Sequence, residues 1–201
     1  MTAVESDERR LLAWVSPSSA AATRLVTVST ATFVGVAAAL GVCVEAVTGR
    51  ALEPITVAAG SPLEVLAGVG LVVGLLALVI VPHELLHGLF MARYGGRPSY
   101  GIGVSGVLLP YAYAESSRAT YARNQLLAIL LAPLVGITLA GLAALAVVGS
   151  PLLILPIAAN AAGSVGDCWT AGRLLRYPAS VRVEALPDGR GLGIYGPPGT
   201  A

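Results

Sequence analysis

The sequence predicts an all-α membrane protein with four transmembrane helices and a β-hairpin in the cytoplasmic loop between the second and third helices. Hydrophobic residues make up 56% of the 201 residues and charged residues only 11%, with a mean hydropathy of +0.80. A water-soluble protein of this size cannot bury so much apolar surface. Four apolar segments can each cross the ~30 Å hydrocarbon core at ~1.5 Å per helical residue: 25–47, 66–92, 126–148 and 152–174.

The first apolar segment is expected to be a retained membrane anchor. Residues 1–24, which precede it, mix acidic and basic side chains and do not resemble a cleavable signal peptide. They are expected to form a cytoplasmic N-terminal tail. Between the third and fourth segments lies only Gly149-Ser150-Pro151, which predicts a tight hairpin of two antiparallel helices.

Arginine distribution predicts the orientation of a multi-pass cell-membrane protein. The first connection contains only Arg50 and the third contains no arginine, whereas the two ends and the second connection are rich in it. By the positive-inside rule, both termini and the loop after the second segment are cytoplasmic. The arginines on that side are Arg9, Arg10, Arg24, Arg93, Arg97, Arg118, Arg123, Arg173, Arg176, Arg182 and Arg190.

Two regions outside the helices carry further structural signals. In the loop of about residues 95–122, two short strand patterns surround Ser105-Gly106 and predict a β-hairpin. This hairpin is expected to fold back against the helices; an amphipathic interfacial loop is the equal alternative. The four helices and this loop form a domain of residues 25–176. Residues 177–201 are expected to be a flexible cytoplasmic tail, although residues 181–186 alternate like a small strand.

Charge and cysteine content exclude some classes of function. The net charge is +1, so no basic excess points to nucleic acid. Cys43 and Cys168 lie in different apolar segments and predict no disulfide. The expected partners are a membrane protein or peptide substrate and the lipid bilayer, and the sequence carries no signal for an oligomeric state.

The two histidines of the chain form an HExxH motif, Pro82-His83-Glu84-Leu85-Leu86-His87-Gly88, inside the second apolar segment. A spacing of four residues places both imidazoles on one face of a helix, where they can bind one Zn²⁺ with Glu84 as general base. Ionisable side chains are energetically costly inside a membrane, which favours a functional role for this motif. The structural alternative is two buried histidines that form hydrogen bonds with backbone carbonyls.

A zinc hydrolase needs a third protein ligand. His87 lies six residues before Arg93, and Asp167 lies six residues before Arg173, so each is ~9 Å from the cytoplasmic boundary. This equal depth favours Asp167. Glu115 remains the alternative ligand, because a folded-back hairpin could bring it to the histidines.

Two polar residues share a stripe of the fourth helix with Asp167. Asn160 and Ser164 precede it by seven and three residues and are expected to face inward. They could bind the substrate carbonyl or support a metal ligand, or they could form hydrogen bonds between helices.

Over roughly residues 65–175, the chain resembles a family of membrane zincin peptidases that is otherwise a domain of unknown function. The resemblance rests on HELLHG, Tyr111-Ala112-Tyr113-Ala114, Ala132-Pro133 and the stretch from Asn160 to Asp167. The chain is also similar to site-2 proteases, which hold zinc with two histidines of HExxH and an aspartate of a later transmembrane helix. The resemblance implies that His83, His87 and Asp167 bind zinc and that Glu84 is the base.

The predicted function is therefore that of an intramembrane zinc metalloprotease. It would hydrolyse peptide bonds of membrane-associated substrates near the cytoplasmic face, and the hairpin could present a strand edge to an unwound substrate. The alternative is a non-proteolytic membrane protein that binds zinc for a structural or transport role.

Overall fold

Four long apolar helices dominate the computed structural model, which describes residues 10–49, 60–104, 110–116, 119–185 and 191–197. Each of the four is long and apolar enough to cross a membrane, as the hydropathy of the sequence predicts. They are α1 (Ser19–Thr48), α2 (Pro62–Arg93), α3 (Arg123–Val148) and a fourth composed of the 3₁₀ turn η1 (Pro151–Leu153), α4 (Ile154–Gly163) and α5 (Val165–Leu174).

Local capping residues set the ends of these helices. The Ser18 side chain accepts a hydrogen bond from the Ala21 N–H, so α1 begins six residues before the apolar segment itself. Pro62 occupies the first turn of α2, where a missing N–H costs nothing. Gly149 ends α3 with a φ of 68°, a left-handed conformation that favours glycine, and leads into the predicted tight turn.

The fourth apolar segment is interrupted at Ser164, whereas the sequence suggested one continuous helix. There α4 ends and α5 begins, each ten residues long. Gly163 and Gly166 flank the interruption, and glycine is a poor helix former. Asp167 consequently lies in the first turn of α5.

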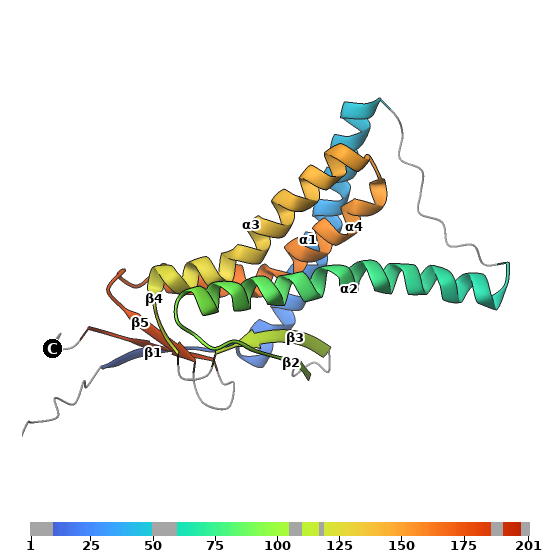
Figure 1. Ribbon diagram of the computed structural model, residues 1–201. Coiled ribbons are helices and arrows are strands. Elements are labelled where there is room, and N and C mark those ends of the chain that lie inside the picture. Colours follow the sequence, from blue (N-terminus) through green and yellow to red (C-terminus); the bar gives the residue numbers. More distant parts are fainter. Residues whose placement is uncertain (1–9, 50–59, 105–109, 117–118, 186–190, 198–201) are drawn as a thin grey trace, which may run out of the picture.

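Two strands, β2 (Ser99–Val104) and β3 (Pro110–Glu115), pair antiparallel and pack against α2. Their register joins Ser99 to Glu115 and Val104 to Pro110. Gly88 makes the close approach possible, because a Cβ there would overlap the Tyr100 hydroxyl. The two strands thus lie beside the part of α2 that carries the histidines (Figure 1).

A second sheet was not part of the predicted all-α fold. It contains β1 (Leu11–Val15), β4 (Thr120–Ala122), β5 (Arg182–Ala185) and β6 (Leu192–Tyr195), in the antiparallel order β1-β6-β5-β4. For β6 the expectation of a flexible C-terminal tail is therefore wrong. β5 lies within residues 181–186, where the alternating sequence suggested a small strand. The N-terminal tail likewise contributes β1.

This sheet is fixed to the helices by a common hydrophobic core. Val181, Val183 and Ile194 are fully buried together with Ile129 of α3 and Leu174 of α5. The sheet therefore holds the ends of two helices that contribute to the histidine site.

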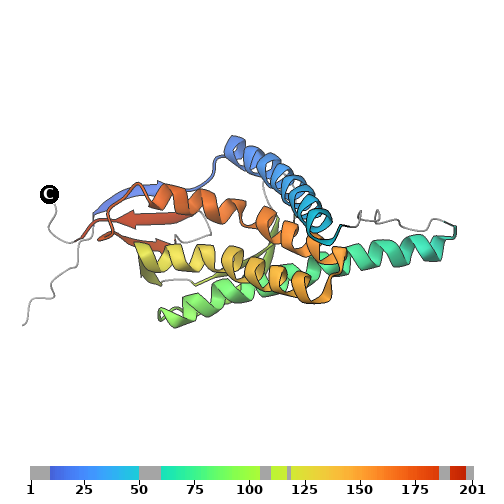
Figure 2. The same ribbon diagram turned by 90° about the horizontal axis from the view of Figure 1, so that it is seen from above.

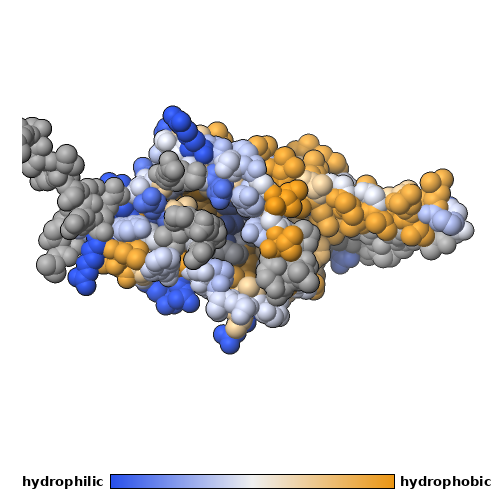
Figure 3. Space-filling model, turned by 90° about the horizontal axis from the view of Figure 1, so that it is seen from below, coloured by the Kyte–Doolittle hydropathy of each residue, from blue (hydrophilic) through white to orange (hydrophobic). Residues whose placement is uncertain are grey.

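The surface divides into an apolar and a polar part. In Figures 1 and 2 the first half of α2 extends beyond the other helices. Hydrophobic residues cover this projecting part in Figure 3, whereas hydrophilic residues gather toward the four-stranded sheet.

Candidate metal centre

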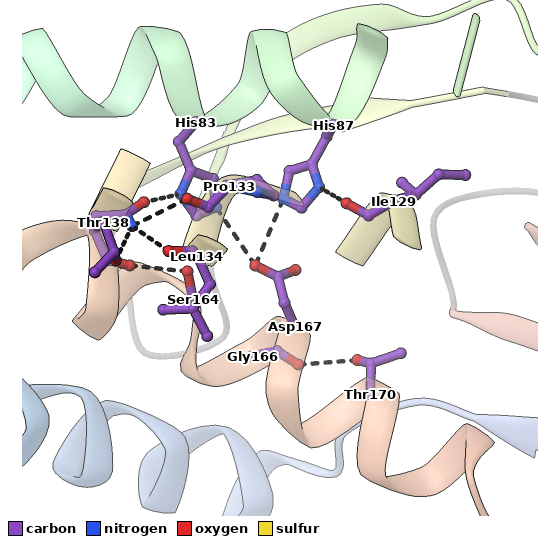
Figure 4. Close-up of polar contacts among 11 residues, drawn as sticks. His83, His87, Ile129, Pro133, Leu134, Thr138, Ser164, Gly166, Asp167 and Thr170 are labelled. Carbon is purple, nitrogen blue, oxygen red and sulfur yellow. Dashed lines mark hydrogen bonds and ion pairs between the residues drawn. The ribbon is translucent and has the colours of Figure 1, made fainter. Parts of the chain in front are cut away.

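Three potential metal ligands from two helices converge in the interior. His83 and His87 are buried on α2, with exposed fractions of 8% and 7%, and their ring centroids are 4.9 Å apart. Asp167 Oδ2 lies 3.4 Å from His83 Nε2 and 3.5 Å from His87 Nε2. Figure 4 shows both imidazoles pointing from α2 toward this carboxylate. All three ligand atoms lie within 4.8 Å of one another.

A proline in α3 orients His87. His87 Nδ1 lies 2.8 Å from the Ile129 carbonyl oxygen, so this nitrogen carries the proton and donates it. The carbonyl is available because the residue four positions later, Pro133, has no N–H to complete the helical hydrogen bond. Pro133 thus leaves the Ile129 carbonyl free, which would otherwise accept a hydrogen bond within α3.

Asn160 orients His83 in the same way. Its amide Nδ2 donates to the Pro133 carbonyl over 3.1 Å, which leaves Oδ1 facing His83 Nδ1 at 3.0 Å. Because Oδ1 is only an acceptor, the proton of the neutral His83 imidazole must be on Nδ1. Asn160 is completely buried, so its contacts are with the protein interior.

The resulting donor set fits a metal cation. With both protons on Nδ1, the Nε2 lone pairs of both histidines and a carboxylate oxygen of Asp167 face one another. Three acceptors converging without a donor between them suit a cation. Two imidazole nitrogens, a carboxylate oxygen and an open position are typical of catalytic zinc.

Glu84 lies beside this group and lines a cavity. Its carboxylate is half-buried and faces the backbone N–H of Ala114 on β3. The cavity has a volume of about 560 Å³ and, apart from His83 and Glu84, is lined by apolar side chains and tyrosine: Leu76, Val79, Ile80, Ile102, Tyr111, Ala112, Ala159 and Gly163. The space next to the carboxylate can therefore hold an apolar peptide segment.

The other predicted site residues lie elsewhere. The Ser164 hydroxyl donates to the Asn160 carbonyl over 2.9 Å and stabilises the helix junction. Glu115 is exposed at the end of β3 and is not part of the metal-ligand group among the described residues. The sequence analysis did not predict the orienting role of Ile129 and Pro133. The available signal was Pro133 itself, a proline inside an apolar helix, but no candidate site residue lies near it in the sequence.

Replacing Asn160 with Ala should weaken zinc binding by about 10–100-fold, because His83 would lose the acceptor that fixes its Nδ1 proton. Metal titration of the purified full chain measures this. The matched control is Ser164→Ala on the same stripe, which should keep the zinc affinity because Ser164 bonds only its own helix. Equal zinc affinity of N160A and the unmodified chain would contradict the orienting role.

The comparisons with known proteins agree with this geometry. A family model described as "Putative zincin peptidase" matches residues 76–182, more than half of the chain. The match contains His83, His87, Asn160 and Asp167. No curated protein and no solved structure matches the chain.

Proposed function

The chain belongs to this zincin peptidase family, and on that premise we propose that it is an intramembrane zinc metalloprotease. It would hydrolyse peptide bonds of membrane-associated substrates near the cytoplasmic face. The observation that carries the proposal is the convergence of three acceptor atoms, from His83, His87 and Asp167, beside the Glu84 carboxylate and its apolar cavity.

The residues of the site have separate tasks. Zinc, when bound, would polarise a water molecule and the scissile carbonyl. Glu84 would take a proton from the attacking water and pass it to the departing amine. Asn160 and the Ile129 carbonyl would keep both imidazoles in the ligand tautomer, with their Nε2 atoms toward the metal.

Several properties support a membrane location. Large hydrophobic side chains are exposed along all of α1 and α2, a pattern that is costly in water and favourable in lipid. Strands from near both ends of the chain, β1 and β6, pair in one sheet, which agrees with both termini lying on one side of the membrane. With the arginine distribution, this supports cytoplasmic N and C termini.

We further propose that the edge of β3 that faces away from β2 binds the unwound substrate; in the described part of the chain no other strand pairs with this edge. Two observations set its hydrogen-bonding pattern. The N–H of Ala114 faces Glu84, and Pro110, which has no N–H, lies an even number of residue pairs away, four, and so occupies an equivalent position. Because such positions alternate along an antiparallel strand, the N–H of Ala112 also points away from β2. Ala112 lines the cavity, so its backbone can pair with a peptide there.

Replacing Ala112 with Pro should lower the cleavage rate by about tenfold, since the substrate would lose one backbone hydrogen bond. The β2 and β3 pairing should persist, because this N–H points away from β2. Val104→Pro is the control: the N–H of Val104 points to the opposite edge of the pair. If A112P and V104P cleave the same substrate equally fast, the β3 edge does not bind it.

Proteolysis itself is tested in cells that make either the unmodified chain or Glu84→Gln. Quantitative mass spectrometry of membrane-protein fragments should reveal products that only the unmodified chain generates. Such products also identify the substrate. Identical fragment profiles at equal protein levels would contradict the proposed activity.

A further inference from the structure

A second cavity, of about 130 Å³, lies where the end of α5 meets β1, away from the histidine site. Figure 2 shows β1, in dark blue, beside the end of the fourth helix. The residues around this cavity are aromatic, cationic or small: Trp14, Val15, Ser16, Trp169, Arg173, Arg176 and Tyr177. Among the residues that the structure describes, no acidic side chain lines it.

The two arginines are available to bind a ligand. Arg173 and Arg176 are exposed, and neither forms an ion pair with an acidic side chain in the part of the chain that the structure describes. The Arg173 guanidinium lies 5.1 Å from the centre of the Trp169 ring. Stacking of this kind uses the face of the guanidinium and leaves its N–H groups free to donate.

The carbonyl groups at the end of α5 are already hydrogen-bonded. Those of Ala171, Arg173 and Leu174 accept from backbone N–H groups of the following turn. The Tyr177 carbonyl accepts from Arg123 Nη1 over 2.6 Å. These four carbonyl groups therefore already have donors, and the charged side chains that line the cavity among the described residues are all cationic, which suits an anion.

We propose that this cavity binds a phosphate group through Arg173, Arg176 and the Ser16 hydroxyl. Guanidinium groups bind phosphate oxygens with paired hydrogen bonds, and the small volume fits a single such group. The group can belong to an anionic lipid or be free phosphate. Trp14, which is 62% exposed, would contact the interfacial part of a lipid. The lipid source rests on the membrane location proposed above; free phosphate does not.

Tryptophan fluorescence gives a direct readout, because Trp14 and Trp169 are the only two tryptophans of the chain and both line the cavity. The purified full chain is titrated with inorganic phosphate in detergent, with chloride at equal ionic strength as reference. It is also reconstituted into phosphatidylcholine vesicles with and without phosphatidylglycerol. We expect a saturable spectral change with at least one of the two phosphate probes.

A matched pair of double variants locates the site. R173Q/R176Q should bind at least about tenfold more weakly, because it loses two charge-assisted contacts. R93Q/R182Q removes the same charge from exposed positions outside the cavity and should bind like the unmodified chain. Circular dichroism checks folding, and Arg176→Gln alone replaces the first double variant if that one fails to fold.

The outcomes separate the two sources. A response to phosphatidylglycerol alone assigns a lipid headgroup, and a response to inorganic phosphate assigns the free ion. No saturable response to either probe, or equal weakening in both double variants, overturns the proposal. Neither result depends on zinc or on proteolysis, so failure here is distinct from failure of the proposed function.

Discussion

Replacing Glu84 with Gln is expected to leave zinc bound while it lowers peptide hydrolysis by about 10²–10⁴-fold. Glutamine keeps the size of the side chain but cannot take a proton from water. Glu84 does not belong to the group of three converging ligand atoms, so zinc affinity should not depend on its charge to first order. Elemental analysis of the purified chain measures the zinc content, and cleavage of the substrate found in the fragment comparison measures the rate.

Glu64→Gln is the control for this variant. Glu64 lies in the first turn of the same helix and outside the cavity that Glu84 lines. It should keep both zinc and cleavage. If E84Q cleaves as fast as the unmodified chain, Glu84 is not the base. A purely structural role of zinc makes the further prediction that E84Q changes nothing that depends on the metal.

Replacing Asp167 with Ala should weaken zinc binding by at least about 100-fold, because loss of a direct ligand exceeds the ~10–100-fold cost of losing an outer partner. Its Oδ2 is the one carboxylate oxygen in contact with both imidazoles among the described residues. Zinc titration against a chelating competitor measures the affinity. Cleavage should be lost in parallel.

Glu115→Ala discriminates between the two candidate third ligands. Glu115 is exposed at the end of β3, so E115A should bind zinc like the unmodified chain. The opposite pattern, with zinc retained in D167A and lost in E115A, would assign the third ligand to the hairpin and contradict the convergence seen in the structure.

The sequence predicts the helices and the meeting of Asp167 with the histidines because both depend on simple spacings. Continuous apolar runs of sufficient length leave few choices besides membrane-spanning helices. The equal distance of His87 and Asp167 from a following arginine gave both the same depth, and the structure places Asp167 against both imidazoles. HExxH needs only the helical repeat to bring its two histidines together.

The four-stranded sheet could not be predicted in the same way. Its strands are three to five residues long, and β1 pairs with β6 from the opposite end of the chain. Such short strands carry little periodic signal, and their stability comes from pairing and from burial of Val183 and Ile194. The local secondary-structure propensity of the two tails therefore favoured irregular structure.

The shared helix face of Asn160 and Ser164 predicts their burial but not their hydrogen-bond partners. Both are buried and lie one turn apart, yet of the two only Asn160 forms a hydrogen bond with a histidine. Ser164 instead lies at the junction of α4 and α5 and bonds back to the preceding turn. The stripe predicted burial for both residues, but the contacts depend on the interruption of the helix, which spacing does not reveal.

The strand order also implies the order in which the candidate site is assembled during synthesis. β6 lies between β1 and β5, so β1 has no described strand partner until β6 has been synthesised. The same sheet packs on Ile129 and Leu174, in the two helices that present the His87 acceptor and Asp167. A chain synthesised only as far as α5 would therefore lack the sheet that packs on both helices, and the site would be completed only when β6 joins β1 and β5.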